Sequence, residues 1–313
     1  MIVDPMLALA AEHANIPKKI YGDTGLAAIE VTGTDAAVFL QGQLTCNIDE
    51  LSDSHSSIAA LCNAKGRVIS TLLVVKTPQG FVLILPSELR DTVADKLRRY
   101  VLRAKVQLAQ DKRLAICGIS GRVGPAAGLE PAQTDFSVAL SPEPLIKLPA
   151  APRFLWLLPE SLAAEKIAKL TEQQDVVRGS LAEWRYRDID SGLPWFGPEQ
   201  SEQHIPQMLN LDRLGGISFN KGCYTGQEIV ARTHYLGKVK RALFVAEYSG
   251  AGLPQPGSTV RDLECGVAGT VLTAAAWAGS THLLLVLQIV DGMPKNLILD
   301  GDNHAQLTLV SAQ

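Results

Sequence analysis

Several kinds of segment are absent from this 313-residue sequence, and each absence narrows the classes of protein to which it can belong. No run of 18 uninterrupted apolar residues is present, so we expect no membrane span. Near the start, Asp4 precedes the apolar stretch and the lysines follow it, which is the reverse of a secretory signal, so we expect no export. There is also no internal repeat and no low-complexity tail.

Cysteine is scarce and scattered. The five cysteines are Cys46, Cys62, Cys117, Cys223 and Cys265, with no CxxC pair. An odd number at wide spacing argues against a disulfide framework and against a zinc or cluster site built by this chain alone. We therefore expect a reduced, cytoplasmic setting and no resident metal. The net charge of −3 and the pI of about 6.1 argue against a surface that is basic throughout, although a local basic face remains compatible with them.

The first third of the chain reads as a β-meander followed by a helix. Strands are expected at 26–32, 58–63, 68–76 and 81–85 because these stretches are rich in branched and apolar residues and are bounded by turn residues. A helix is expected after Pro86, where Leu89, Val93, Leu97 and Tyr100 recur at helical spacing.

The middle third continues with strands and helices in irregular order. Strands are expected at 106–109, 114–119 and 154–158, a helix at 161–170, and a loop over the Gly-, Ala- and Pro-rich residues 121–151. A further helix is expected from Ser180 to Gly192, since Ser180 and Glu183 form a capping box and Gly192 supplies the stop.

From about Leu243 onward, short strands alternate with Gly, Pro, Asn and Asp, which predicts a small barrel-like β unit. The fold class expected overall is α+β rather than a doubly wound parallel sheet. We predict a region 1–240, made of subdomains at about 20–110 and 111–240, followed by a C-terminal β-barrel at 241–313.

Residues 210–241 form the least generic segment. Thr225 and Glu228 fit a capping box, which predicts a helix beginning at Gly226. Cys223 then lies two residues before the cap, near the positive end of the helix and close to Lys221, and both features favour the thiolate. Cys223 and Lys221 are therefore the candidate catalytic residues. The competing interpretation is that Cys223 is a small buried residue.

A basic stretch follows that helix start and includes one aromatic residue; its members are Arg232, His234, Tyr235, Lys238, Lys240 and Arg241. Such a stretch is suited to phosphates or to the polyglutamate tail of a folate, but a solvated face at a domain junction is the favoured interpretation. His204 and His234 are interpreted as surface residues rather than as catalytic bases.

The string Lys221-Gly-Cys-Tyr-Thr-Gly-Gln-Glu228 closely resembles the signature of the YgfZ family, whose members are related to the aminomethyltransferase (T-protein) of the glycine cleavage system. Companion stretches occur in the family's order, namely Phe39–Thr45, Cys62–Arg67, Asp188–Pro194, Ile205–Gln207 and Asn210–Asp212.

This resemblance implies a T-protein-like fold that binds tetrahydrofolate or another folate in a central channel. It assigns Trp184 to a folate-contacting tryptophan of the bacterial relatives, and it aligns Leu26 with a second one, so that stacking contact is lost here. It also implies folate-binding roles for a further set of residues: Gln41, Gln43, Thr45, Lys65, Tyr224, Gln227 and Glu228. By their chemistry alone, Gln41, Gln43 and Thr45 are equally suited to capping local backbone. Asn63 stands where relatives have a carboxylate.

By this resemblance, the leading hypothesis is a folate-binding accessory protein that maintains iron–sulfur enzymes, including those that methylthiolate tRNA. Cys223 would then serve as a transient cluster ligand, a sulfur carrier or an oxidation sensor. The sequence itself shows no S-adenosylmethionine glycine loop and no three-cysteine motif, so an effect on tRNA is expected to be indirect. The alternatives are a tetrahydrofolate-dependent aminomethyltransferase and a protein that binds tRNA directly through Arg232–Arg241.

Overall fold

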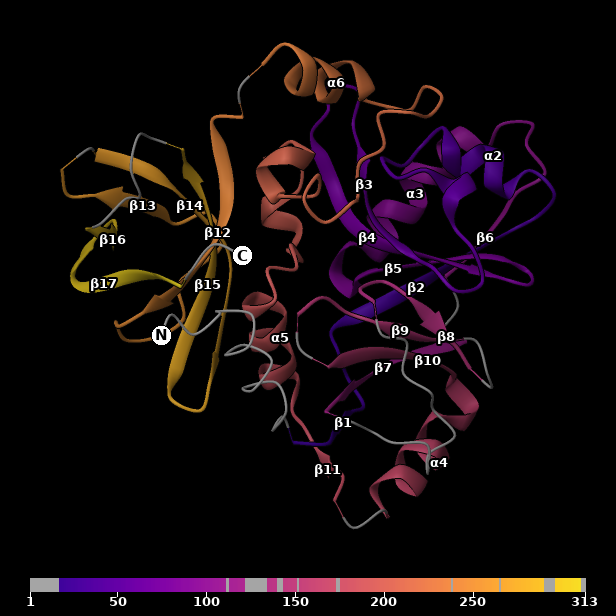
Figure 1. The fold of residues 1–313 in the computed structure, drawn as a ribbon, viewed down its shortest axis with the longest axis horizontal. Helices are drawn as coiled ribbons and strands as arrows, with labels where there is room; N and C mark the ends of the chain where they lie inside the picture. The colour runs from indigo at the N-terminus through magenta and orange to yellow at the C-terminus, as the bar shows by residue number, and fades with distance from the viewer. Residues whose placement is uncertain are drawn as a thin grey trace, which may run out of the picture.

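The computed structural model describes residues 17–110, 113–121, 134–139, 143–150, 152–172, 175–237, 239–264, 266–289 and 296–310. Their strands form two open sheets and one closed barrel, and helix α5 (Leu181–Asp190) stands between the barrel and the sheets (Figure 1). The predicted α+β class and the predicted C-terminal barrel are confirmed. No helix within the described ranges is both long and apolar enough to cross a membrane.

The first sheet has five antiparallel strands in the order β3-β4-β5-β2-β6. Its strands are β2 (Leu26–Thr32), β3 (Ser57–Cys62), β4 (Val68–Thr77), β5 (Gly80–Pro86) and β6 (Gln107–Ala109). The predicted meander is therefore confirmed. Strands β4 and β5 are buried along almost their whole length, as expected for branched and apolar runs that are covered on both faces.

Short helices connect and cover this sheet: α2 (Ala36–Gln41), α3 (Arg90–Val101) and 3-10 turns at Ile48–Glu50 and Ser87–Leu89. Helix α3 buries Val93, Ala94 and Leu97 and packs on β2, which confirms the predicted apolar face at Leu89, Val93 and Leu97. Tyr100 was expected on that face but is exposed.

The second sheet has six strands in the order β11-β1-β7-β10-β9-β8. Its elements are β1 (Lys19–Tyr21), β7 (Leu114–Ser120), β8 (Val138–Ala139), β9 (Leu145–Lys147), β10 (Arg153–Pro159) and β11 (Val177–Arg178), with helix α4 (Glu160–Thr171) packed on β1, β7 and β10. The described parts of 121–151 are not all loop, because β8 and β9 lie within it. These strands are too short to show a period in the sequence, yet all of β9 is buried against β10.

The barrel closes in the order β12-β15-β14-β13-β16-β17. Its strands are β12 (Arg241–Tyr248), β13 (Thr259–Asp262), β14 (Gly266–Trp277), β15 (Ser280–Gln288), β16 (Leu297–Leu299) and β17 (Asp302–Val310). Asn210 fastens its first strand to the preceding segment, since the Asn210 amide donates to Leu243 O at 2.9 Å and accepts from Leu243 N at 3.2 Å.

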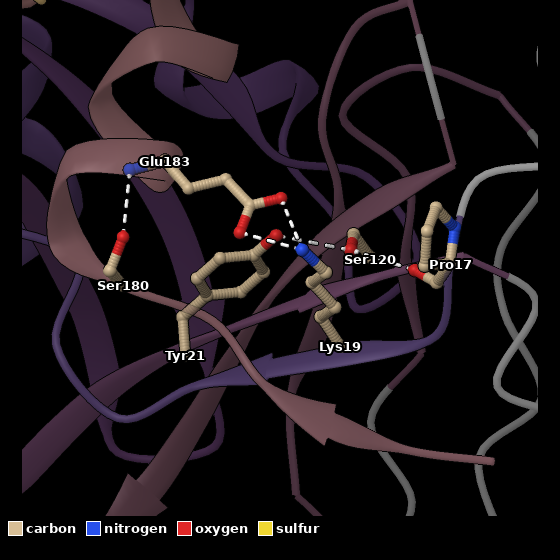
Figure 2. A network of polar contacts seen from close by, with 6 residues as sticks. All are labelled: Pro17, Lys19, Tyr21, Ser120, Ser180 and Glu183. Atoms are coloured by element: carbon tan, nitrogen blue, oxygen red, sulfur yellow. Dashed lines mark hydrogen bonds and ion pairs between the residues drawn. The ribbon is translucent and has the colours of Figure 1, made fainter. Parts of the chain in front are cut away.

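Two helices connect these units. Helix α5 begins as predicted, because Ser180 Oγ accepts a hydrogen bond from Glu183 N at 3.2 Å. The Glu183 carboxylate does not complete the capping box; instead it accepts from Lys19 Nζ at 2.8 and 2.9 Å, as Figure 2 shows. Helix α6 (Gln227–Tyr235) lies at the top of the molecule in Figure 1, and Val230 is its one buried residue. Two 3-10 turns, Pro198–Gln200 and Pro206–Leu209, lie between these helices in the chain.

Candidate functional site

Three segments that are far apart in the sequence meet at the start of α6: residues 41–46, 63–67 and 221–228. Thr225 N donates to Gly42 O at 3.3 Å, and Lys221 Nζ donates to Leu44 O at 2.8 Å. The Asn63–Arg67 turn packs directly on the first residues of the helix. Three of the family stretches identified from the sequence, Phe39–Thr45, Cys62–Arg67 and Lys221–Glu228, thus meet around the 221–228 loop.

Two glycines allow this approach. Gly66 in the β3–β4 turn and Gly226 at the N-cap of α6 both have positive φ, at +66° and +85°. A Cβ on Gly226 would lie 2.5 Å from Asn63 O and 2.9 Å from Gly66 Cα, and a Cβ on Gly66 would lie 2.9 Å from Ile229 Cβ. The turn and the helix can therefore touch only if both positions lack a side chain.

Lys221 ties the loop to the first sheet. Its ammonium group donates to Leu44 O and, at 2.5 Å, to Cys46 O. Burial lowers the pKa of Lys221 to about 8, although Cys46 and Asp49 act in the opposite direction. The Lys221 ammonium therefore donates to backbone carbonyls, and no contact with the Cys223 thiol supports the activating role that the sequence predicted for it.

Cys223 is exposed, whereas the other three cysteines among the described residues are buried. Burial raises the pKa of Cys46 and Cys62 to about 12 and that of Cys117 to about 11, which keeps these thiols protonated at neutral pH. Cys265 lies outside the described residues. Of the described thiols, only that of Cys223 is accessible to a partner, and a Cβ on its neighbour Gly222 would meet nothing within 4 Å. The interpretation of Cys223 as a small buried residue is wrong.

The predicted capping box at Thr225 and Glu228 is also wrong. Gly226 is the N-cap and no side chain caps the helix there. Gln227 reaches back instead, and its Oε1 accepts from Tyr224 N at 3.1 Å. Tyr224 is buried, and burial is the main cause that raises the pKa of its hydroxyl. Glu228 is exposed in the first helical turn. A glycine occupies the N-cap position because any side chain there would collide with the backbone of the β3–β4 turn.

Gln41 and Thr45, two further candidates near the 221–228 loop, use their side chains for hydrogen bonds within the protein. Gln41 donates to Asn47 Oδ1 at 2.6 Å and accepts from Ile48 N at 2.8 Å. Thr45 donates to Gly216 O at 2.6 Å and accepts from Ala60 N at 2.8 Å. Both therefore hold backbone segments together, which was one of their two predicted roles.

Two further candidates near the 221–228 loop could still contact a ligand, one through an unpaired acceptor and the other because it is exposed. Gln43 Oε1 is buried without a hydrogen-bond partner among the described residues, so its acceptor is open to a ligand. Lys65 is exposed in the turn, where its backbone N–H donates to Asn63 Oδ1 at 2.9 Å. Asn63 itself shapes that turn by accepting from Lys65 N and Arg67 N, a role that an uncharged amide fills.

Trp184 and Leu26 belong to a second location, on and beside α5. Trp184 is completely buried: the Tyr21 ring centroid lies 4.9 Å from it, the Arg153 guanidinium carbon lies 4.5 Å over its ring, and a Cβ on Gly118 would overlap it at 2.4 Å. Leu26 lines a cavity of about 270 Å³.

Asp188 connects these two residues. Asp188 lines the same cavity as Leu26, together with Trp195 and Phe196, and its carboxylate forms a buried ion pair with Arg153, whose guanidinium lies over the Trp184 ring. Burial raises the pKa of Asp188 to about 6, against the opposing charge of Arg153. Arg153 Nε and Nη1 and Trp184 Nε1 are buried without hydrogen-bond partners among the described residues. Several polar groups there are thus left unsatisfied, which is costly unless a ligand or water meets them.

Sequence reasoning missed Arg153, Tyr21 and His282 as parts of this second location. Tyr21 Oη lies 3.3 Å from Ser120 Oγ (Figure 2), and burial raises the Tyr21 pKa to about 12. His282 contacts the Asp190 carboxylate through Nδ1 and lies 3.0 Å from Tyr186 Oη through Nε2, which joins the barrel to α5. A buried arginine in an apolar strand was the one available signal, because an unpaired charge is not stable there.

The basic stretch after the helix start is only partly described, since Lys238 lies outside the described residues. Arg232, His234 and Lys240 are exposed, as predicted for a solvated face, whereas His204 is buried. The expectation that His204 is a surface residue is wrong, because its Nε2 lies 3.0 Å from Gln200 Oε1 inside the fold. Burial lowers the His204 pKa to about 4, with Arg67 and Arg241 adding to that effect. Within the described ranges, no group of three or more His, Cys, Asp or Glu residues could hold a metal ion.

Comparison with known proteins yields close matches over nearly the full length. A tRNA-modifying protein YgfZ from Klebsiella pneumoniae (strain 342) is 32% identical over 96% of this chain and 94% of its own length. Its namesake from Escherichia coli O157:H7 is 33% identical, covering 95% of this chain and 93% of that protein. The crystal structure of the glycine cleavage system aminomethyltransferase T from Bartonella henselae matches with a TM-score of 0.78 at 16% identity, over 96% of this chain and 87% of that one. No protein-family model matches the chain. The structural match confirms the predicted T-protein-like fold.

Proposed function

This chain belongs to the YgfZ family, whose curated members are named tRNA-modifying proteins, and from that premise we propose that it is an accessory protein in tRNA modification that acts through the Cys223 thiol. Its clients are iron–sulfur enzymes, including those that methylthiolate tRNA, and its setting is the cytoplasm. It binds a folate at the α5 location. Cys223 binds an iron–sulfur cluster transiently, while the cluster is transferred to a client enzyme or repaired.

The observation that carries this proposal is the placement of Cys223. The exposed thiol lies on a loop whose two sides are fixed: Lys221 holds it to the carbonyls of Leu44 and Cys46, and Gly226 packs on the Asn63–Arg67 turn. No other described residues complete a set of metal ligands around Cys223, so its thiol cannot hold a cluster permanently. It can still supply one bond to a metal that a partner also binds. Such a geometry suits a transient contact between proteins.

The residues at α5 fit a folate in three respects. The cavity that Leu26 lines is walled partly by Trp195 and Phe196, which suits a flat heteroaromatic ring. Asp188 offers a carboxylate of the kind that accepts paired hydrogen bonds from an aminopyrimidine edge. Behind that carboxylate, Arg153 and Trp184 hold buried N–H groups without hydrogen-bond partners among the described residues, and we propose that a shift of these side chains lets them donate to the carbonyl and ring nitrogens of a pterin. A bound tetrahydrofolate would supply a one-carbon carrier there.

Trp184 fits this role as a hydrogen-bond donor rather than as a stacking surface, because Tyr21 and Arg153 already cover its ring. We therefore expect Trp184→Phe to weaken tetrahydrofolate binding by a few-fold through loss of the Nε1 donor, and Asp188→Asn to weaken it more. Isothermal titration calorimetry measures both, with Trp277→Phe as a matched control on the barrel hairpin. Equal affinity in wild type and both variants would remove folate from this location.

The function itself is tested by complementation. A strain that lacks the family member is supplied with wild type, Cys223→Ala or Cys223→Ser, and methylthiolated adenosine is measured in bulk tRNA. We expect wild type to restore the modification and both variants to fail, since neither keeps a thiol. Gly222→Ala, next to the thiol and free of steric conflict, is the matched control and should complement. If Cys223→Ala complements fully, the thiol has no part in the mechanism.

A further inference from the structure

An aromatic cluster lies beside the Cys223 loop, on the exposed side of α6. The Phe219 and His234 rings stack with centroids 3.8 Å apart and planes 14° from parallel. Tyr235 meets both rings edge-on, at 6.0 Å from Phe219 and 4.8 Å from His234. The Tyr235 side chain is 64% exposed, and Leu236 beside it is 85% exposed. Exposed apolar side chains that lie together, such as Tyr235 and Leu236 here, mark a candidate recognition site.

Phe219 also lines a cavity of about 330 Å³, close to the lower end of the range of about 300–1,000 Å³ for small-molecule sites. The other walls of this cavity are mostly polar and include Asn47, Glu50, His55, Ser57 and Asn220. Asn47 already donates to Glu50 at 2.8 Å and Ser57 to Ile58 O at 2.9 Å, so the His55 ring and the Asn220 amide are the groups here best placed to read the edge of a nucleobase. The cavity thus combines an aromatic wall with polar walls, as a site for a single base requires.

Basic residues lie close to this aromatic cluster in the chain. Arg232 is exposed one turn before Tyr235 on the same helix, and Lys240 is exposed five residues after it. Arg241 is partly exposed at the start of β12. None of the three forms a salt bridge with another described residue, so their charges remain available to phosphates.

We propose that Phe219, His234 and Tyr235, with the adjacent polar cavity, bind one unpaired nucleotide of an RNA while Arg232 and Lys240 contact its flanking phosphates. Recognition of single-stranded RNA commonly combines stacking of a splayed base on Phe, Tyr or His with hydrogen bonds to its edges and cationic contacts to its backbone. This inference deepens the proposed function and rests on it, since the base would be presented near Cys223 by a tRNA loop.

A protein partner is the weaker interpretation of the same surface. A docking groove for a protein helix is lined by apolar side chains at helical spacing, whereas this cavity is lined largely by amides, hydroxyls and charged groups. The flanking cations suit a polyanion. The parallel ring stack, which leaves Tyr235 exposed, matches the flat surface of a base.

The test uses the full chain and a synthetic RNA hairpin with a seven-nucleotide unpaired loop, compared with a fully paired RNA of equal length. Fluorescence anisotropy should give tighter binding to the hairpin. Tyr235→Ala should weaken hairpin binding about 5- to 150-fold, the range for losing one base–aromatic stack. Tyr235→Phe should bind within about twofold of wild type because the ring remains. Arg232→Gln should lower the slope of log affinity against log salt by about 0.7, the value for one phosphate contact in a single strand.

Tyr100→Ala is the matched control, because Tyr100 is an exposed tyrosine on α3 outside the cluster. The inference is overturned if wild type binds hairpin and paired RNA equally, if it binds neither, or if Tyr235→Ala binds like Tyr100→Ala. Absence of RNA binding would leave the aromatic cluster to a protein partner. Because binding is measured on the isolated protein, these outcomes are separate from complementation by Cys223 variants, which tests the proposed function alone.

Discussion

The contact between the β3–β4 turn and the start of α6 yields the sharpest prediction, through the substitution Gly226→Ala. Gly226 has φ +85°, and a Cβ there would lie 2.5 Å from Asn63 O and 2.9 Å from Gly66 Cα. Neither neighbour is a flexible side chain, so backbone must move. The turn and the helix have to separate, and the Cys223 loop moves with the helix.

The size of the effect follows from two costs. Holding alanine in the left-handed region costs about 1–2 kcal/mol, and separating the packed backbone adds to it, so we expect a loss of about 2 kcal/mol or more. For a cooperative unit of about 150–250 residues, a loss of 2 kcal/mol lowers Tm by roughly 4–8 °C. Gly222→Ala, in the same loop with nothing within 4 Å of its Cβ, should leave Tm within about 1 °C.

Circular dichroism melts give the two Tm values, and amide hydrogen exchange locates the change. We expect faster exchange in residues 63–67 and 222–228 of Gly226→Ala, with the barrel unaffected. The two alanine variants melting together would falsify the reasoning, since they differ chiefly in the backbone contact and in the sign of φ.

Three further outcomes test other parts of the structure. His204 should make folding acid-sensitive: because its folded pKa of about 4 lies below the unfolded value of 6.5, the unfolded chain binds the proton more tightly, and about 3 kcal/mol of stability is lost as pH falls from 6.5 to 4. Urea unfolding of His204→Gln should lack this loss, whereas the exposed His234→Gln should retain it. Asn210→Ala should loosen the barrel by about 2 kcal/mol, because it removes both hydrogen bonds to Leu243; unchanged exchange at the start of β12 would contradict this. Iodoacetamide at neutral pH should alkylate Cys223 long before the three buried cysteines, and peptide mass spectrometry reads each site separately.

Much of the secondary structure could be predicted from the sequence because its signals are local. The β3–β4 hairpin, the amphipathic helix α3 and the Ser180 cap of α5 each depend on residues within a few positions of one another. Elements whose partners are distant were missed. Strand β1 is only three residues long and is held by β7 and β11, about 100 and 160 residues further along the chain. Its own residues carry no period that would reveal it.

The candidate site likewise has parts that could be predicted from the sequence and parts that could not. The 221–228 motif and the helix that follows were predictable from residue types and spacing, whereas only the structure shows that Cys223 is exposed. The capping box was not correct, because Gly226 gives the β3–β4 turn the space that a capping side chain would fill. Lys221 was expected beside the thiol, yet its charge is stabilised by the carbonyls of Leu44 and Cys46 from another sheet.

By itself, then, the sequence determined the α+β class, the barrel, the family and the loop that holds the candidate thiol, since periodicity and motif spacing are properties of the chain alone. Tertiary structure alone decided that Trp184 is covered on its ring by Tyr21 and Arg153, and that Arg153 and Asp188 meet beside the Leu26 cavity. It also decided that Phe219 stacks on His234, 15 residues later in the chain. Burial and ring contacts depend on which surfaces the folded chain brings together, and no local pattern encodes that proximity.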